Sequence, residues 1–237
     1  MQRSNARSAR FHSLREWCKS IVFALAIWMV LRTFVVEAFR IPSGSMENTL
    51  LVGDFLFVTK ALYGSEVPLT HTRLPVIREP RRGDIVVFKS VEGDFAVVKR
   101  LVGLSGDTMA MAHGMLFRNG DRLDEPYTIR TDSSRSEAAA ERARMRAWQM
   151  PHLASPPITD YSPDLHDWGP IVVPPESLFV MGDNRDNSVD SRYWGFLPRA
   201  NLRGKPLIVY YSYNPDSWHP LPFLTAIRWR RLFTLPR

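Results

Sequence analysis

Residues 95–102 read Phe-Ala-Val-Val-Lys-Arg-Leu-Val, a segment rich in β-branched side chains that is typical of a β-strand. Similar short runs, most of them bounded by Gly, Pro or Asp, occur at Asp54–Thr59, Asp84–Phe88, Met115–Phe117, Ile171–Val173, Leu178–Met181 and Leu207–Tyr213. Asn119-Gly120 is a hairpin-turn signal that follows one of these runs. No helical pattern alternates with them, which argues against a parallel α/β sheet. The sequence therefore predicts a mostly β fold with an antiparallel β-sheet.

Two segments depart from the strand pattern. Residues 124–170 are polar and punctuated by proline, and within them Glu137–Met150 has the alanine-rich composition of a helix. We expect residues 124–170 to form a small insertion lobe. Near the C-terminus, Phe223–Phe233 alternates bulky apolar residues with arginines. This second pattern fits a segment lying on anionic lipid, and a simple surface helix or tail fits it equally well.

The N-terminus has the composition of a membrane anchor. Residues 1–19 carry five basic side chains against one acidic side chain, and sixteen of the twenty residues in Ser20–Phe39 are apolar. About 20 mostly apolar residues are enough for a helix to cross a bilayer. A cleavable signal peptide begins in the same way, but residues 36–40 offer no small-residue cleavage site. We therefore expect one transmembrane helix over residues 20–39.

The charges on either side of this segment predict its orientation. Only Arg40 and Lys60 are basic within residues 40–60, whereas residues 1–19 are strongly basic. Because positively charged flanks stay in the cytoplasm, we expect residues 1–19 to be cytoplasmic. Residues 40–237 should then form a domain on the outer side of the cytoplasmic membrane, periplasmic or otherwise extracytoplasmic.

Composition excludes several classes of function. The net charge of +7 resides at the two ends, since residues 228–237 add four arginines to the basic N-terminus. The body is close to neutral, so we expect no nucleic-acid partner. A single cysteine excludes a disulfide framework and a cysteine-based zinc site, and the six histidines lack metal-ligand spacing. We expect neither a metal nor another cofactor.

Ser45 and Lys99 are the first candidate site residues. Ser45 follows Pro42 and Gly44 in a turn-rich segment that can expose a hydroxyl, although a plain linker would have the same composition. Lys99 shares one strand face with Val97 and Leu101. If that face is buried, desolvation lowers the pKa of Lys99 and allows it to act as a general base. A solvent-exposed lysine on an edge strand is the alternative.

A third candidate is the polar segment that follows Gly182. Asp and Asn side chains can bond to nearby backbone and hold an irregular loop rigid. Such a loop could support a lysine through the Ser188 hydroxyl and an ion pair between Asp190 and Arg192. A solvated loop has the same spacing.

Four segments, taken together and in this order, resemble the bacterial type I signal peptidases, also called leader peptidases. These segments are Phe39–Lys60, Arg82–Lys89, Val98–Asp107 and Gly182–Pro198. The resemblance implies a membrane-anchored, mostly β catalytic domain outside the cytoplasmic membrane. It also implies cleavage of signal peptides of exported preproteins after small side chains, without a metal or cofactor.

The resemblance assigns roles to the candidate residues. Ser45 is similar to the family's nucleophile and Lys99 to its general base. Ser43 is similar to the hydroxyl that completes an oxyanion hole with the Ser45 backbone N–H. Ser188 resembles the serine that orients the lysine, and Asp190 with Arg192 resembles a supporting pair. Positions similar to those near the apolar substrate cleft are Phe39, Ile41, Met46, Leu50, Val97 and Val98.

The chain also departs from the family pattern. It shows one N-terminal span where many members have two, and Asn48 stands where proline is common. The family has no motif in residues 124–170. Two other functions remain open: a dedicated Ser-Lys maturation protease with a single substrate, such as a pilin, and a non-enzymatic membrane-anchored β module.

Overall fold

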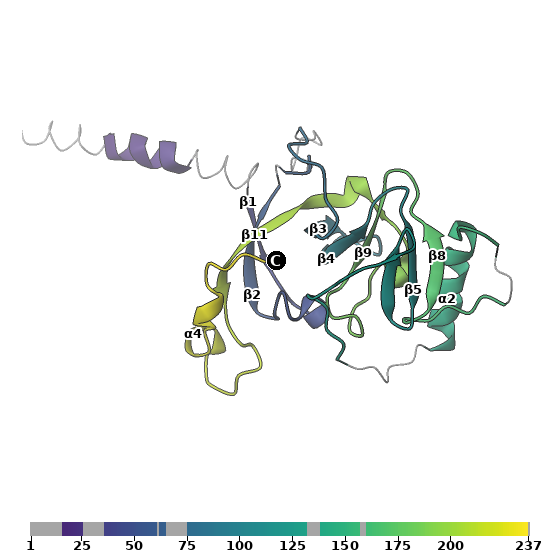
Figure 1. The fold of residues 1–237 in the computed structure, drawn as a ribbon. Coiled ribbons are helices and arrows are strands. Elements are labelled where there is room, and N and C mark those ends of the chain that lie inside the picture. Colours follow the sequence, from purple (N-terminus) through teal and green to yellow (C-terminus); the bar gives the residue numbers. More distant parts are fainter. Residues whose placement is uncertain are drawn as a thin grey trace, which may run out of the picture.

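The computed structural model describes residues 16–25, 36–60, 62–64, 75–131, 138–156 and 160–236. The described strands form two antiparallel sheets, one of seven strands in the order β1-β2-β11-β3-β4-β9-β10 and one of four in the order β7-β6-β5-β8 (Figure 1). The strands are β1 Val36–Arg40, β2 Asp54–Thr59, β3 Ile85–Lys89, β4 Ala96–Gly103, β5 Thr108–Ala112, β6 Met115–Arg118, β7 Asp121–Arg122, β8 Trp168–Val172, β9 Ser177–Met181, β10 Leu197–Pro198 and β11 Leu202–Ser212. The prediction of a mostly β, antiparallel fold is confirmed.

Helices are few and short in the described body. The α-helices are α2 Ala139–Gln149, α3 Ser191–Trp194 and α4 Pro222–Thr225, and the single-turn 3-10 helices are η2 Gly44–Met46, η3 Met150–His152, η4 Arg199–Asn201 and η5 Trp229–Arg231. The expected helix at Glu137–Met150 corresponds to α2.

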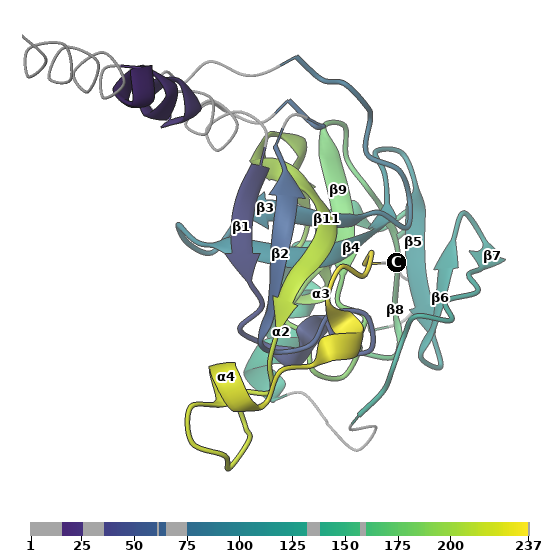
Figure 2. The ribbon, with the colours of Figure 1, turned by 90° about the vertical axis from the view of Figure 1, so that its left-hand side faces the viewer.

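The long strand β11 joins the two halves of the larger sheet. Its first residues pair with β3, at Leu202 opposite Phe88, and its later residues pair with β2, at Ser212 opposite Asp54. Two register shifts interrupt the pairing with β2, and such bulges increase the local twist of a strand. The sheet therefore curls, which brings β1 and the following turn in front of β3 and β4 (Figure 2).

The core lies on both faces of β3, whose apolar residues alternate between two clusters. Ile85 and Val87 pack with Ile41, Leu56 and other residues of one cluster, whereas Val86 and Phe88 belong to a second cluster. A strand covered on both faces needs a continuous apolar sequence. β4 follows the same alternation, with Val98 in the first cluster and Val97 and Leu101 in the second.

Each of the seven predicted strand runs corresponds to an observed strand, with small differences at the ends. The hairpin at Asn119-Gly120 is also confirmed, because the two residues have φ values of 56° and 88° and join β6 to β7. Strand β5 was not predicted, because its sequence Thr-Met-Ala-Met-Ala lacks typical strand formers. Burial of Met109 and Met111 against the core stabilises this strand instead.

The N-terminal boundary differs from the expected one. Residues 36–39, expected at the end of the membrane anchor, instead belong to β1 and pair with β2. The apolar side chains of Val36, Ala38 and Phe39 suit a spanning helix and a half-buried strand equally, so hydropathy placed the boundary too late. Residues 1–15 and 26–35 of the expected N-terminus and anchor lie outside the described residues. In the part of the chain that is described, every helix is too short or too polar to cross a bilayer.

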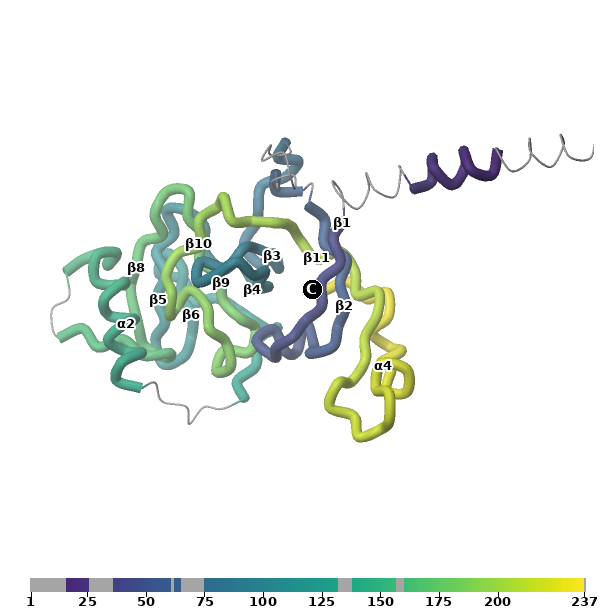
Figure 3. Tube along the Cα trace, turned by 180° about the vertical axis from the view of Figure 1, so that it is seen from behind, coloured from purple at the N-terminus to yellow at the C-terminus, as the bar shows by residue number. Residues whose placement is uncertain are grey.

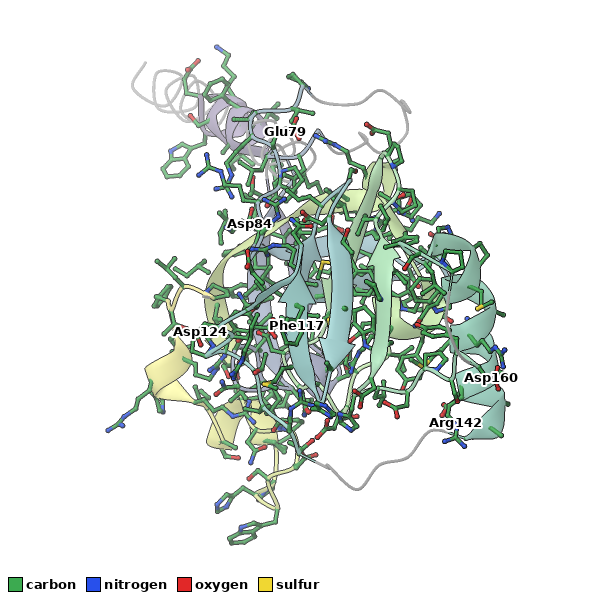
Figure 4. All side chains as sticks on the ribbon, turned by 45° about the vertical axis from the view of Figure 1, so that its right-hand side comes forward. Glu79, Asp84, Phe117, Asp124, Arg142 and Asp160 are labelled. Atoms are coloured by element: carbon green, nitrogen blue, oxygen red, sulfur yellow. The ribbon has the colours of Figure 1, made fainter. Side chains whose placement is uncertain are left out.

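The expected lobe packs closely on the rest of the domain. Met145 of α2 is buried against Leu165 and against Tyr193 of α3. Residues 168–170 belong to β8, so the lobe ends earlier than residue 170. Asp124 lies on the opposite side of the molecule from Arg142 of α2, so the lobe reaches across the domain (Figure 4).

The C-terminal segment returns alongside β11, where Ile227 pairs with Tyr213 and Thr234 with Val209. Before this return, the segment carries α4 away from the body (Figure 3). Two of its arginines make internal contacts: Arg228 donates to the Val52 carbonyl at 2.8 Å, and Arg231 pairs with Asp54 at 2.5 Å. These two side chains hold the segment against the domain.

Removal of residues 1–35 should leave a folded domain, because every described strand is retained. Removal of residues 1–40 also deletes β1 and the contacts of Phe39 with the core. We expect the shorter protein to melt about 5–10 °C lower than the longer one, as a loss of a few kcal/mol would produce in a domain of this size. Thermal unfolding followed by circular dichroism measures the difference, and equal melting temperatures would show that β1 is not part of the stable sheet.

Candidate active site

Ser45 lies in η2, in the turn between β1 and β2. Backbone bonds close this turn, because Ile41 N–H donates to the Asp54 carbonyl at 2.8 Å and Gly53 N–H donates to the Ile41 carbonyl at 3.0 Å. The buried side chains of Met46 and Leu50 fix the turn against the core. A flexible linker would have no such contacts, so the linker interpretation of this segment is wrong.

Lys99 projects from β4, which lies between β3 and β9 and is therefore an interior strand. The alternative of an edge-strand lysine is wrong. Only 4% of Lys99 is exposed, and its Nζ donates a hydrogen bond of 2.6 Å to Ser45 Oγ. The structure thus brings together two side chains that lie 54 positions apart in the sequence.

Burial dominates the protonation of Lys99. It lowers the pKa of the amine from 10.5 to about 8, because the ammonium loses its hydration. The negative charges of Asp190 and Asp183 oppose this decrease in pKa, and the positive charge of Arg192 reinforces it. The neutral amine is therefore about a tenth of the population at pH 7 and about half of it at pH 8.

The polar segment from Gly182 to Arg192 forms a mostly buried loop, which we call the polar loop. The alternative of a solvated loop is therefore wrong. Arg192 forms a bidentate pair with Asp190, with Nε and Nη2 each 2.9 Å from a carboxylate oxygen. The Gly182 N–H also donates to Asp190 at 2.9 Å. Burial by itself would raise the pKa of Asp190, but the charge and hydrogen bonds of Arg192 hold that pKa below its usual range. Asp190 thus remains a carboxylate beside Lys99.

Ser188 is buried in the same loop. Within the described part of the chain its Oγ has no hydrogen-bond partner of good geometry, although it lies close to the Asp190 carboxyl. A Cβ on Gly182 would collide with the Ser188 hydroxyl and would lie 2.5 Å from the Ser45 carbonyl oxygen. Gly182 therefore allows the Ser188 and Ser45 segments to approach each other.

A cleft of about 560 Å³ opens beside Ser45 and Lys99. The hydroxyl of Ser43 is at its edge, with Oγ 3.5 Å from Ser45 Oγ. Five of the six residues expected near an apolar cleft line it, namely Phe39, Ile41, Met46, Val97 and Val98. Leu50 does not; it is fully buried in the core behind the cleft. Three aromatic side chains that were not predicted there also line the cleft, namely Phe88, Phe95 and Trp194.

An ion pair that the sequence analysis did not anticipate joins β4 to the polar loop. Arg100 donates to both carboxylate oxygens of Asp183, at 2.8 and 2.6 Å. Thr49, four residues after Ser45, donates to Asp183 at 2.5 Å and accepts from Arg100 at 3.2 Å. Two signals for this ion pair were available in the sequence: Arg100 lies next to Lys99, and Asp183 lies in the polar loop. No sequence pattern indicated that Arg100 and Asp183 pair with each other.

This arrangement is suited to acyl transfer. A hydroxyl bonded to an amine with a pKa near neutrality can lose its proton as it attacks a carbonyl. The described residues contain no cluster of three or more His, Cys, Asp or Glu side chains that could hold a metal ion.

Comparison with known proteins places similar sequences in one family. The family described as "Signal peptidase, peptidase S26" matches residues 14–211. The chain is 37% identical to a signal peptidase I of Pseudomonas aeruginosa, over 90% of this chain and 78% of that protein. It is 35% identical to a probable signal peptidase I-2 of Synechocystis, over 83% and 72% of the two chains. A crystal structure of a signal peptidase I from Enterococcus faecalis aligns with 54% of this chain and 97% of its own, at 30% identity and a TM-score of 0.36.

Substitution of Gly182→Ala should destabilise the domain, because its new Cβ would meet the Ser45 backbone and the Ser188 side chain. We expect a loss of about 1–3 kcal/mol, which is usual for overpacking a tight site. Gly93→Ala is a matched control, since its Cβ would meet only the exposed and movable ring of Phe95. Urea unfolding measures both variants, and equal stability of the two would contradict the close packing at Gly182.

Proposed function

The chain belongs to the signal peptidase family, peptidase S26, and from that premise we propose that it is a membrane-anchored serine endopeptidase with a Ser45–Lys99 dyad. Its substrates are the signal peptides of exported preproteins. The observation that carries the proposal is the hydrogen bond of 2.6 Å between Lys99 Nζ and Ser45 Oγ in a buried site. The proposed mechanism requires a neutral lysine, and the pKa of about 8 for Lys99 supports this requirement.

The proposed reaction is a two-step acyl transfer. The neutral Lys99 amine accepts the Ser45 proton while Ser45 Oγ attacks the carbonyl carbon of the scissile peptide bond. The resulting ammonium gives this proton to the leaving amine as the C–N bond breaks, and an ester on Ser45 remains. Water then attacks the ester, Lys99 takes a proton from that water, and Ser45 recovers its proton as the signal peptide leaves.

Ser43 and the cleft supply binding in this proposal. The Ser43 hydroxyl and the Ser45 N–H donate to the oxygen that becomes negative in the tetrahedral intermediate. The apolar cleft holds an extended peptide with small side chains next to the scissile bond. Ser188, Asp190 and Arg192 keep Lys99 in place.

The anchor and its orientation belong to the same proposal. A single span that ends before β1, with the N-terminus in the cytoplasm, keeps the domain on the outer face of the cytoplasmic membrane. Preproteins arrive there with their signal peptides still in the lipid. Membrane lipid is thus a partner of the enzyme together with the signal peptide.

Loss of either member of the dyad should abolish cleavage of a reporter preprotein. Ser45→Ala and Lys99→Arg should each lower kcat by at least about 10³-fold, because arginine stays protonated and cannot accept the proton. Lys99→Met removes the charge. It tests whether Lys99→Arg is inactive only because that variant does not fold. Lys89→Arg, at an exposed lysine of β3, is the matched control and should keep wild-type activity. Turnover of Lys99→Arg within tenfold of wild type would sink the proposed mechanism.

The pH dependence follows from the lowered pKa of Lys99. Activity requires the neutral amine, so kcat/KM should rise about tenfold per pH unit below pH 8 and level off above it. Initial rates between pH 5.5 and 10 on the reporter preprotein measure this profile. A rise that continues to about pH 10.5, the ordinary value for lysine, would show that the amine is not desolvated in the working enzyme.

Several unrelated preproteins, tested side by side, separate a general enzyme from a dedicated one. We expect all of them to be cleaved after small side chains. Cleavage of one pilin-like substrate alone would favour the dedicated maturation protease, and wild-type function of Ser45→Ala in cells would favour the non-enzymatic module.

A further inference from the structure

The first residues of the lobe, Glu125–Thr131, lie across the back of the polar loop, and we call this segment the strap. Its backbone joins the loop as an added strand would: Ile129 N–H donates to the Asp183 carbonyl at 2.9 Å, and Arg185 N–H donates to the Ile129 carbonyl at 2.9 Å. Ile129 thus holds the peptide groups on both sides of Asn184. The Asn184 N–H between them donates to the Ser45 carbonyl at 3.1 Å.

Two side chains fasten the ends of the strap to the same loop. Glu125 accepts a bidentate pair from the buried Arg185, at 2.6 and 2.7 Å. At the other end, Thr131 Oγ1 donates to the Asn184 side chain at 3.0 Å. The strap is therefore bound along its whole length to the loop that supports the Ser45 carbonyl.

Tyr127 connects the strap to both halves of the site. Its ring lies 3.8 Å from the Arg100 guanidinium, a close cation–π contact. Arg100 is the neighbour of Lys99 on β4 and is paired with Asp183. The Tyr127 carbonyl accepts a hydrogen bond of 3.1 Å from the Asn48 side chain, three residues after Ser45.

The contact with Asn48 is a feature of this chain's own sequence. Asn48 has a φ of 83°, which asparagine tolerates and which proline cannot adopt. The departure from the common family residue thus adds a bond between the Ser45 turn and the strap. Tyr127 also donates to Glu125 at 2.8 Å, and burial, together with the charge of Glu125, raises the pKa of its hydroxyl well above the usual range. Tyr127 therefore remains a neutral donor.

We propose that the strap positions the Ser45–Lys99 pair, with Tyr127 as its main positioning residue. The proposal rests on the function proposed above and gives the start of the lobe a role in it. Tyr127 touches neither Ser45 nor Lys99, and it acts through Arg100 on β4 and through Asn48 on the Ser45 turn. A displacement of about 1 Å between reacting groups can cost on the order of 10²-fold in rate.

Kinetics of the full-length protein on the reporter preprotein test this role. Tyr127→Leu should lower kcat about 10- to 100-fold and leave KM within about threefold, because the cleft is unchanged. The acid limb of the kcat profile should move to higher pH, because a loosened Arg100–Asp183 pair leaves more of the Asp183 charge to raise the pKa of Lys99. The charged neighbours of Lys99, namely Asp190, Asp183 and Arg192, are kept in all variants. Tyr127→Phe keeps the ring over Arg100 and should stay within about threefold of wild type.

The matched control is Tyr161→Leu, at a half-buried lobe tyrosine that bonds to Gln149 and Gly169 away from Arg100. It should lower the melting temperature without moving the acid limb. If Tyr127→Leu does not fold, Glu125→Gln tests the positioning role of the strap in its place. This substitution weakens the ion pair with Arg185 and changes the side-chain volume little. An acid limb and kcat equal to those of wild type in the folded strap variant would overturn the positioning role. Inactive wild-type protein would instead contradict the proposed function itself.

Discussion

The structure depends on keeping an almost fully buried lysine amine in contact with a serine hydroxyl. Lowering the pKa of Lys99 from 10.5 to about 8 corresponds to a free-energy difference of about 3 kcal/mol in favour of the neutral form. Below pH 8 the folded protein carries that destabilisation in full, because both folded and unfolded chains then bind the proton. The destabilisation disappears as the pH rises from 8 to 10.5. The rest of the site has to hold Lys99 in place against this cost.

Three buried ion pairs provide that support, and each joins a residue of the polar loop to a partner through two hydrogen bonds. Arg192 and Asp190 close the loop on itself, Asp183 ties it to Arg100 of β4, and Arg185 ties it to Glu125 of the strap. Removal of one partner from such a pair leaves an uncompensated buried charge, which destabilises far more than the pair itself stabilises. The loop is therefore held in one arrangement, and Ser45 and Lys99 are held with it.

Local patterns predicted the parts of this arrangement that depend on neighbours in sequence. The alternation in residues 95–102 placed Lys99 on one strand face with Val97 and Leu101 but left the burial of that face open, and Asn119-Gly120 marked a hairpin. The resemblance to a family selected Ser45, since a serine in a turn has no distinguishing pattern of its own. Strand β5 was missed because tertiary burial of its methionines overrides a weak strand propensity. Tyr127 was missed because its partners Arg100 and Asn48 lie far away in the sequence, and only the folded chain brings them together.

The protonation of Lys99 is the central claim, and it can be observed directly. NMR of the full-length protein with isotope-labelled lysine side chains follows the chemical shifts next to each amine as the pH is raised, and Lys99→Arg identifies the Lys99 signal by its loss. The account predicts a midpoint near pH 8 for Lys99, well below that of the exposed lysines. A midpoint near 10.5, the ordinary lysine value, would contradict it and remove the base from the proposed mechanism.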